Sequence, residues 1–261
     1  MKTQLRTIAC SSILAAAFAT VSAQTTFTRI TTGPVVSDGA DGEGCAWVDF
    51  DNDSDLDLYV SCDLTGSNLL YRNDAGGVFT KLTNGPIQSA GPGSIGAAWA
   101  DFDNDGRIDL FVSRQNGRPS LLFPQQADGT FIRTNLPSGG FSRGAAWADY
   151  DNDGFLDLMV GDMTQNVLWR NSGEGTLVAV KDTSIVTTPN GSNLTWADYD
   201  NDGDSDLFGP LGSSKDQLRP ESRFRAGDKR NRLRFQSKRA FSPTLGQHSA
   251  PLRATFVSHC Q

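Results

Sequence analysis

The sequence predicts an all-β fold, a β-propeller of four-stranded blades that is incomplete, with three full blades and a partial fourth. An aspartate-rich motif of ten residues recurs four times, at intervals of 52, 48 and 49 residues, a period typical of propeller blades. Short apolar runs separated by Gly, Asp and Asn flank the copies, and no window of comparable length has the apolar spacing of a helix. The copies are DFDNDSDLDL from Asp49, DFDNDGRIDL from Asp101, DYDNDGFLDL from Asp149 and DYDNDGDSDL from Asp198.

Each full repeat supplies four predicted strands. The first precedes the motif, the second follows it, and the third lies in a segment such as Asn-x-Leu-Tyr-Arg-Asn. The fourth follows a glycine turn, as at 78–82, and the turn residues between the runs predict one antiparallel sheet per repeat. The second strands are expected at 56–61, 108–113 and 156–161, and the third strands at 68–73, 120–123 and 166–171.

A tryptophan lies two residues before the first aspartate of every motif copy. A ring of aromatic side chains would suit a ligand-binding face. One large aromatic at the same place in each repeat is also what packing between blades requires, and we favour this second explanation. The series is Trp47, Trp99, Trp147 and Trp196.

These motifs resemble a known repeat family. The pattern W-A-D-[FY]-D-N-D-G-x-x-D-L, then N-x-L-[YW]-R-N, then G-G or D-G before x-F, is similar to the FG-GAP or VCBS-type repeat of the integrin α-chain propeller and of secreted bacterial proteins. The resemblance covers about residues 26–211. It implies an aspartate loop that binds calcium and a propeller that in this family has about seven blades.

The motif itself predicts a metal site in each loop. Carboxylates at positions 1, 3, 5 and 9 of one tight loop repel one another unless a cation lies among them. An all-oxygen, carboxylate-rich donor set favours calcium over zinc, copper and magnesium. Position 6 needs a sharp turn and is glycine except at Ser54. The predicted ligands are Asp49, Asp51, Asp53, Asp57, Asp101, Asp103, Asp105, Asp109, Asp149, Asp151, Asp153, Asp157, Asp198, Asp200, Asp202 and Asp206.

The loop differs from an EF-hand, because position 12 is never the glutamate that an EF-hand requires and strands flank the loop. Asx-rich turns that bind no metal are an alternative. We expect the calcium to be structural rather than part of a reaction, because a metal that binds only the folded chain stabilises it. Position 12 is Val60, Val112, Val160 and Gly209.

Three functions stay open from the sequence. The first is a non-enzymatic module for adhesion or for an extracellular ligand, a glycan or a cell-surface protein. The second is a propeller enzyme acting on polysaccharide; against it, His248 and His259 both lie in the C-terminal segment, and Glu43 and Glu174 are isolated. The third is an inactive, truncated fragment of a larger repeat protein.

Charge divides the chain near residue 212. Residues 212–261 hold 11 basic and 3 acidic side chains, whereas residues 1–211 hold 12 basic and 27 acidic ones. The acidic part repels phosphates, so nucleic acid is excluded as its partner. For the basic tail we expect disorder, with an arm for anionic surfaces or a lost reading frame as alternatives.

Residues 1–23 have the features of a signal peptide. Lys2 and Arg6 precede an apolar run too short to span a bilayer, and Val21-Ser22-Ala23 fits the small-x-small cleavage rule. No later segment is long and apolar enough to span a membrane. The sequence therefore predicts a secreted or periplasmic protein, cleaved near Ala23.

Export places the cysteines in an oxidising compartment. Cys45 and Cys62 flank the first motif symmetrically, eight residues before Asp53 and nine after it. If the flanking strands pair as a hairpin, the two thiols face each other, although a register shift of one residue would separate them. We predict a cross-strand disulfide between them.

The N-terminal segment predicts how the ring ends. Residues 26–34 match 78–86, the end of the first full repeat, so the strand at 26–33 would lack a blade of its own. It could pair with 207–209 and close a small ring. The last blade would still be incomplete, so we expect residues 24–211 not to form a compact monomer and to self-associate through open sheet edges.

Overall fold

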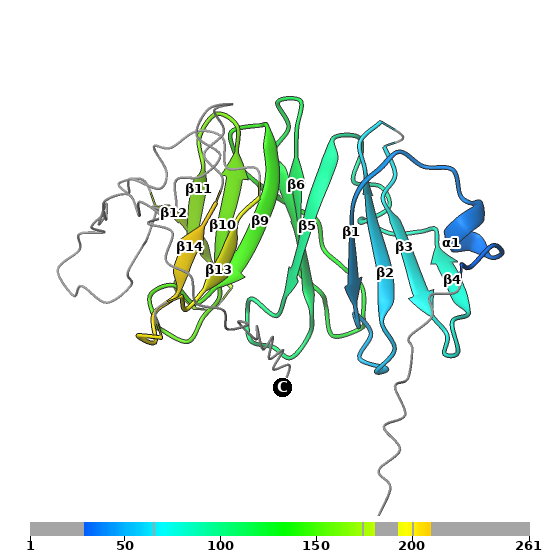
Figure 1. Cartoon of the computed structure of the whole chain (residues 1–261), viewed down its shortest axis with the longest axis horizontal. Helices are drawn as coiled ribbons and strands as arrows, with labels where there is room; N and C mark the ends of the chain where they lie inside the picture. The colour runs from blue at the N-terminus through cyan, green and yellow to red at the C-terminus, as the bar shows by residue number, and fades with distance from the viewer. Residues whose placement is uncertain (1–28, 65, 174, 181–192, 200, 210–261) are drawn as a thin grey trace, which may run out of the picture.

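A computed structural model describes residues 29–64, 66–173, 175–180, 193–199 and 201–209. Three four-stranded antiparallel sheets and one two-stranded sheet stand side by side, as Figure 1 shows. In every sheet the strands follow in chain order. The predicted all-β fold of three blades and part of a fourth is confirmed.

The strands have the following bounds. Blade 1 holds β1 (Gly42–Val48), β2 (Asp57–Cys62), β3 (Leu69–Asn73) and β4 (Phe79–Leu82). Blade 2 holds β5 (Ser94–Ala100), β6 (Asp109–Arg114), β7 (Ser120–Phe123) and β8 (Thr134–Leu136). Blade 3 holds β9 (Ser142–Ala148), β10 (Asp157–Asp162), β11 (Val167–Asn171) and β12 (Leu177–Val180). Blade 4 holds β13 (Thr195–Ala197) and β14 (Asp206–Phe208).

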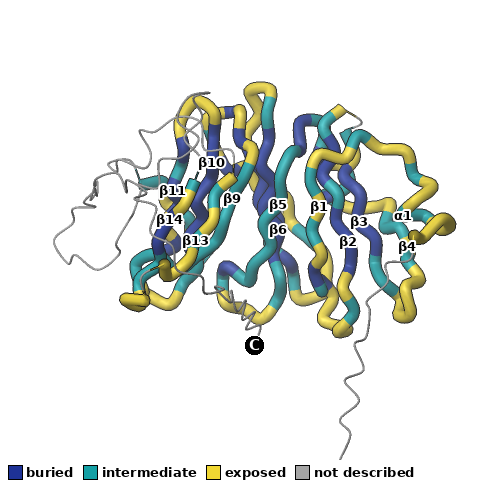
Figure 2. Tube along the Cα trace, viewed as in Figure 1, coloured by how far each residue is buried: buried dark blue, intermediate teal, exposed yellow. Residues whose placement is uncertain are grey.

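The first strands of the blades join the blades to one another. Strand β5 contacts both β1 and β9, and β9 contacts β13. The second and third strands carry the core, since every residue of β6, β7 and β10 is buried. Figure 2 shows these strands in dark blue, with the exposed loops at their ends in yellow. This arrangement leaves the loops between first and second strands open to solvent.

A glycine and a serine bring neighbouring first strands close together. The Ser113 hydroxyl lies 3.3 Å from the Gly96 carbonyl oxygen and 2.9 Å from the Arg143 carbonyl oxygen of the next blade. At the equivalent place in blade 1, the Ser61 hydroxyl donates to the Ile95 carbonyl at 2.6 Å. A Cβ on Gly96 would lie 2.4 Å from the Arg143 carbonyl oxygen, so this approach requires glycine.

Three of the four tryptophans pack between blades, as we favoured. Trp99 meets Tyr59 of blade 1 edge to face, with ring centroids 5.8 Å apart. Trp147 stacks on Phe102 of blade 2 at 5.6 Å, and its indole N–H donates to the Ala98 carbonyl at 3.3 Å. Trp47 differs because no described blade precedes it.

The expected N-terminal strand was wrong in its described part. Residues 29–33 are not a strand, and residues Pro34–Ser37 form a short helix, α1, that contacts β4. Proline fits the first turn of a helix, which explains the start at Pro34. Asp38 then ties the segment to blade 1, accepting from the Tyr71 hydroxyl at 2.8 Å and pairing with Lys81 at 2.9 Å.

The small closed ring that the sequence left open is not formed by the described residues. The first strands contact one another in the order β1, β5, β9 and β13, so blades 2 and 3 stand between blades 1 and 4 along the row. In Figure 1, β13 and β14 lie next to blade 3, across blade 2 from blade 1. Within the described residues β14 pairs only with β13. Residues 26–28, the predicted signal peptide at 1–23 and the basic tail at 212–261 lie outside the described residues.

The predicted disulfide was also wrong: Cys45 and Cys62 are not bonded to each other. The register aligns Cys45 with Val60 and Cys62 with Gly42, so the cysteines are not cross-strand neighbours. A register irregularity between Gly42 and Gly44 adds to the offset. The chain therefore places Cys45 at the surface and Cys62 in the core.

In the described residues, no helix has the length and apolar character needed to cross a membrane.

Candidate metal centres

Four aspartate loops join the first and second strands of the blades. The first aspartate of each loop closes it by accepting two backbone N–H groups. In loop 2, Asp101 accepts from Asp105 at 3.0 Å and from Gly106 at 2.9 Å, one hydrogen bond to each carboxylate oxygen. The other loops repeat both bonds at 2.9 to 3.1 Å. The loops are loop 1 (49–57), loop 2 (101–109), loop 3 (149–157) and loop 4 (198–206).

The closed loop needs two residues with left-handed backbone. Position 4 is always asparagine, which tolerates this region, with φ of 57° to 59°. Position 6 is Gly106, Gly154 or Gly203 with φ of 85° to 92°, but in loop 1 Ser54 has φ of 73°. The invariant asparagine at position 4 was a signal that our sequence reasoning did not use.

Ser54 predicts a stabilising substitution. We expect Ser54→Gly to raise the free energy of unfolding by about 1 kcal/mol, because a side chain is strained in the left-handed region. The matched reverse change, Gly106→Ser in loop 2, should lower it by about the same amount, since only the backbone differs there and no atom lies within 4 Å of the added Cβ. Urea unfolding measures both. Equal stabilities of all three proteins would contradict this reading.

Position 9 holds the loop to the sheet. Asp109 accepts from the backbone N–H groups of Phe102 at 3.1 Å and of Gln125 at 2.8 Å. Asp157 accepts from Tyr150 at 3.0 Å and from Asn171 at 2.7 Å. These carboxylates are fully buried, and their oxygens accept hydrogen bonds there. Through these bonds they join the loop to the segment at the end of the third strand.

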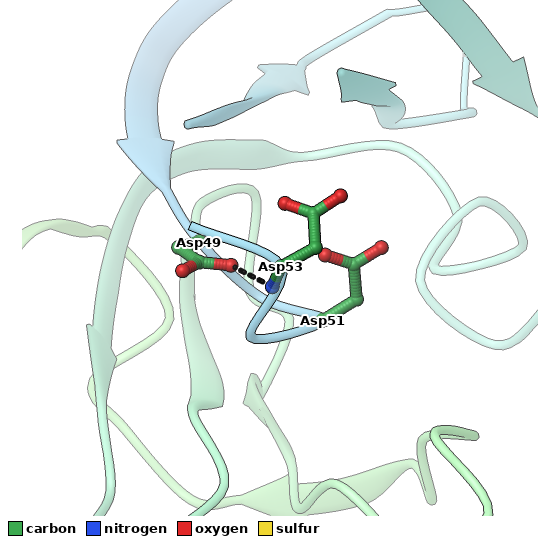
Figure 3. A group of neighbouring side chains, drawn as sticks. All are labelled: Asp49, Asp51 and Asp53. Atoms are coloured by element: carbon green, nitrogen blue, oxygen red, sulfur yellow. Dashed lines mark hydrogen bonds between the residues drawn. The ribbon is translucent and has the colours of Figure 1, made fainter. Parts of the chain in front are cut away.

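The predicted ligands converge in three groups whose carboxylate oxygens lie within 4.8 Å of one another. In loops 2 and 3 positions 1, 3 and 9 meet. In loop 1 positions 1, 3 and 5 meet instead, as Figure 3 shows around the bond from the Asp53 N–H to Asp49. The groups are Asp49, Asp51 and Asp53; Asp101, Asp103 and Asp109; and Asp149, Asp151 and Asp157.

The other predicted ligands are not members of these groups. Position 5 accepts from the backbone N–H of position 7 in all four loops, and only in loop 1 does it also belong to a group among the described residues. Position 9 of loop 1 accepts the same two backbone N–H groups as position 9 of loops 2 and 3, but it is not in the group of three. The separate residues are Asp57, Asp105 and Asp153, with Asp198, Asp202 and Asp206 of loop 4; Asp200 lies outside the described residues.

The electrostatics of the groups favour a cation. Burial raises the pKa of Asp109 and of Asp157 to about 7. The backbone N–H groups that donate to these carboxylates lower the pKa, whereas the neighbouring carboxylates raise it further. Burial, with the adjacent carboxylates, also raises the pKa of Asp51 and Asp103. A bound divalent cation would reverse this penalty, so cation and protons compete for these sites.

In loops 2 and 3, position 3 has one buried carboxylate oxygen without a hydrogen-bond donor among the described residues. Oδ1 of Asp103 is buried and has no hydrogen-bond partner among the described residues, and the same is true of Oδ1 of Asp151. A buried carboxylate oxygen without a donor is costly unless something else fills its place. The donor set consists of carboxylate oxygens alone, which fits calcium.

Arginine makes the three groups unequal. In loop 3 Arg170 donates to Asp151 at 2.6 Å and to Asp153 at 3.0 Å. In loop 2 Arg107 pairs with Asp105, which lies outside the converging group. Among the described residues, no arginine pairs with the three grouped carboxylates of loop 2, nor with those of loop 1, where Arg72 pairs with Asp74 instead.

Amide side chains connect each loop to the next blade. The Asn104 amide donates to the Gly154 carbonyl of loop 3 at 3.1 Å, and the Asn171 amide donates back to the Phe102 carbonyl of loop 2 at 2.6 Å. Asn152 likewise reaches Asp204 in loop 4 at 2.9 Å. The loops thus form one connected rim, seen below β1 and β9 in Figure 1.

The repeats, their loops and their register can now be compared with known families. The chain matches the FG-GAP-like repeat in three overlapping segments, residues 49–112, 101–160 and 149–209. The chain belongs to the FG-GAP repeat family. Each matched segment runs from one aspartate loop to the strand that follows the next aspartate loop. The resemblance found in the motifs is therefore confirmed. Comparison with curated proteins gave no significant match.

Proposed function

We propose that these FG-GAP repeats form a calcium-binding module of an exported protein, and that its surface binds an extracellular ligand, a glycan or a cell-surface protein. The observation that carries the calcium part is the group in loop 2. It joins three carboxylates with no arginine partner, one of them carrying a buried oxygen without a donor. Calcium supplies the missing positive charge and accepts several oxygen ligands at once.

In this proposal calcium is structural. Asp109, one member of the group, holds the loop to the third strand through Phe102 and Gln125. The Gln125 side chain in turn donates to the Phe50 carbonyl of loop 1 at 2.9 Å. A cation at the group therefore stabilises the junction of two blades as well as its own loop, because it binds only when these parts are assembled.

We propose a binding role rather than a catalytic one. Two of the three carboxylates that converge in loop 2, Asp101 and Asp109, also accept backbone N–H groups. Their positions are thus fixed by the loop and the sheet. Export to a secreted or periplasmic location rests on the signal-peptide features of residues 1–23.

Ligand binding is tested on a glycan array probed with the chain in calcium. We expect binding to one class of glycans that disappears in chelator, because the loops order the rim and its neighbouring surface only with the cation bound. Asp128→Asn, which removes one charge at an exposed turn outside the predicted ligands, serves as control and should bind like the unchanged chain. An array without any calcium-dependent signal would remove glycans from the proposal and leave a protein ligand.

A further inference from the structure

Every junction between described blades repeats one arrangement of large side chains. The residue two places after the ninth motif position of one blade is fully buried, and it lies in the same apolar cluster as the tryptophan of the next blade. Tyr59 and Trp99 meet in this way at 5.8 Å. Phe111 with Trp147, and Met159 with Trp196, share the other two clusters. Each junction therefore has two halves. One is the tryptophan of a blade, and the other is the buried residue of the preceding blade that shares its apolar cluster.

The two ends of the row carry one exposed half each. Trp47, the tryptophan of blade 1, is 57% exposed. Phe208 holds the position of Tyr59, Phe111 and Met159 in blade 4 and is 59% exposed, whereas those three are 0% exposed. The same two positions are packed together at every described junction between blades, so each end of the row exposes one half of a junction that is not formed.

A polar contact of the junction is also incomplete at blade 1. The Gln125 and Asn171 amides, at the end of the third strand, donate to the preceding blade at Phe50 and Phe102. Asn73 has the same position, but its amide donates to Leu56 of its own blade at 3.2 Å. Its Oδ1 is buried without a hydrogen-bond partner in the described part of the chain. The end face of blade 1 therefore has both the apolar and the polar features of a junction.

We propose that a second copy of this chain completes the junction, with Trp47 of one copy packing against Phe208 of the other. The two halves do not meet within one copy in this structure, because the first strands contact one another in the order β1, β5, β9 and β13, with blades 2 and 3 between blades 1 and 4. The occupant follows from the molecule itself, since blade-to-blade packing inside the chain shows what each half accepts. The proposal goes beyond the calcium module and does not depend on its ligand.

The contact joins two different surfaces and is therefore head to tail. Such an interface leaves one half open on each partner, so copies add until a ring closes or a chain of copies grows. Association through the sheet edges that we expected from the sequence would use other residues. Association through the end faces and association through the sheet edges can be told apart by mixing two single variants of the end-face residues.

Light scattering on the purified chain, on Trp47→Ser and on Phe208→Ser tests the proposal. Reducing agent is present so that the exposed Cys45 does not cross-link copies. We expect the unchanged chain to reach a mass at least about two-fold above that of one chain, and each variant alone to stay at that of one chain. An equimolar mixture of the variants should form a dimer and nothing larger, because only one intact pair of halves remains.

Ile132→Ser is the matched control, since Ile132 is 53% exposed and lies in blade 2, away from both end faces. It should associate like the unchanged chain. Circular dichroism establishes that each variant is folded, and if one is not, the other single variant still tests its half. A chain that remains single at every concentration would overturn the proposal. So would variants that associate like the unchanged chain, or a mixture that stays at the mass of one chain.

Discussion

Removing calcium with a chelator is expected to lower the free energy of unfolding by about 4 kcal/mol, compared with protein in a roughly ten-fold excess of calcium over Kd. At that excess each site adds about 1.4 kcal/mol, and three groups of carboxylates converge in the described residues. The loss has a physical cause beyond the missing ligand, because the carboxylates then repel one another. Urea unfolding with and without chelator measures the difference.

A single substitution separates calcium binding from loop folding. Asp103→Asn removes the carboxylate whose Oδ1 has no hydrogen-bond partner in the described part of the chain. We expect it to lower stability in calcium by about 1.4 kcal/mol and to leave the chelated protein unchanged or slightly more stable. Stability that is the same with calcium and with chelator, in the unchanged chain, would contradict the metal sites.

Gly96→Ala is expected to destabilise the chain by about 3 kcal/mol, enough to lower Tm by roughly 6–12 °C. Its Cβ would lie 2.4 Å from the Arg143 carbonyl oxygen and 3.0 Å from the Ser113 hydroxyl oxygen. The first strands β5 and β9 must move apart to admit it, and the bond from Ser113 to Arg143 lengthens with them. Thermal unfolding followed by circular dichroism measures the effect.

Gly39→Ala is the control for this prediction. No atom lies within 4 Å of a Cβ at Gly39, so the change should alter stability by less than about 1 kcal/mol. A Tm for Gly96→Ala equal to that of the control would mean that the blades tolerate a wider spacing. The close approach of β5 and β9 would then not contribute to the stability of the junction.

The blades could be predicted from the sequence because their signals are local and repeated. The Asp101 loop, the strand after it and the tryptophan before it recur in one order, and each residue type has one physical use there. The position-6 glycines follow directly from a φ that side chains disfavour. Packing of Trp99 and Trp147 between blades follows from the same regularity.

Other features could not be predicted, because they depend on the register of paired strands and on hydrogen-bond partners far apart in the sequence. Cys45 and Cys62 flank their loop symmetrically, yet the pairing of Cys45 with Val60 separates them. Position 9 was assigned only to metal, whereas Asp109 also accepts two backbone N–H groups, one of them from a residue 16 positions away in the sequence. The resemblance of residues 26–34 to a fourth strand did not outweigh Pro34, which begins α1.

Calorimetric titration of calcium into the chelator-treated chain tests the central claim most directly. The account predicts binding heat from several sites. It also predicts that Asp103→Asn loses one site, while Asp128→Asn, which removes the same charge from an exposed turn of the same blade, keeps every site. Absence of calcium heat from the folded, unchanged chain, or identical titrations of both variants, would contradict the assignment of calcium to these loops.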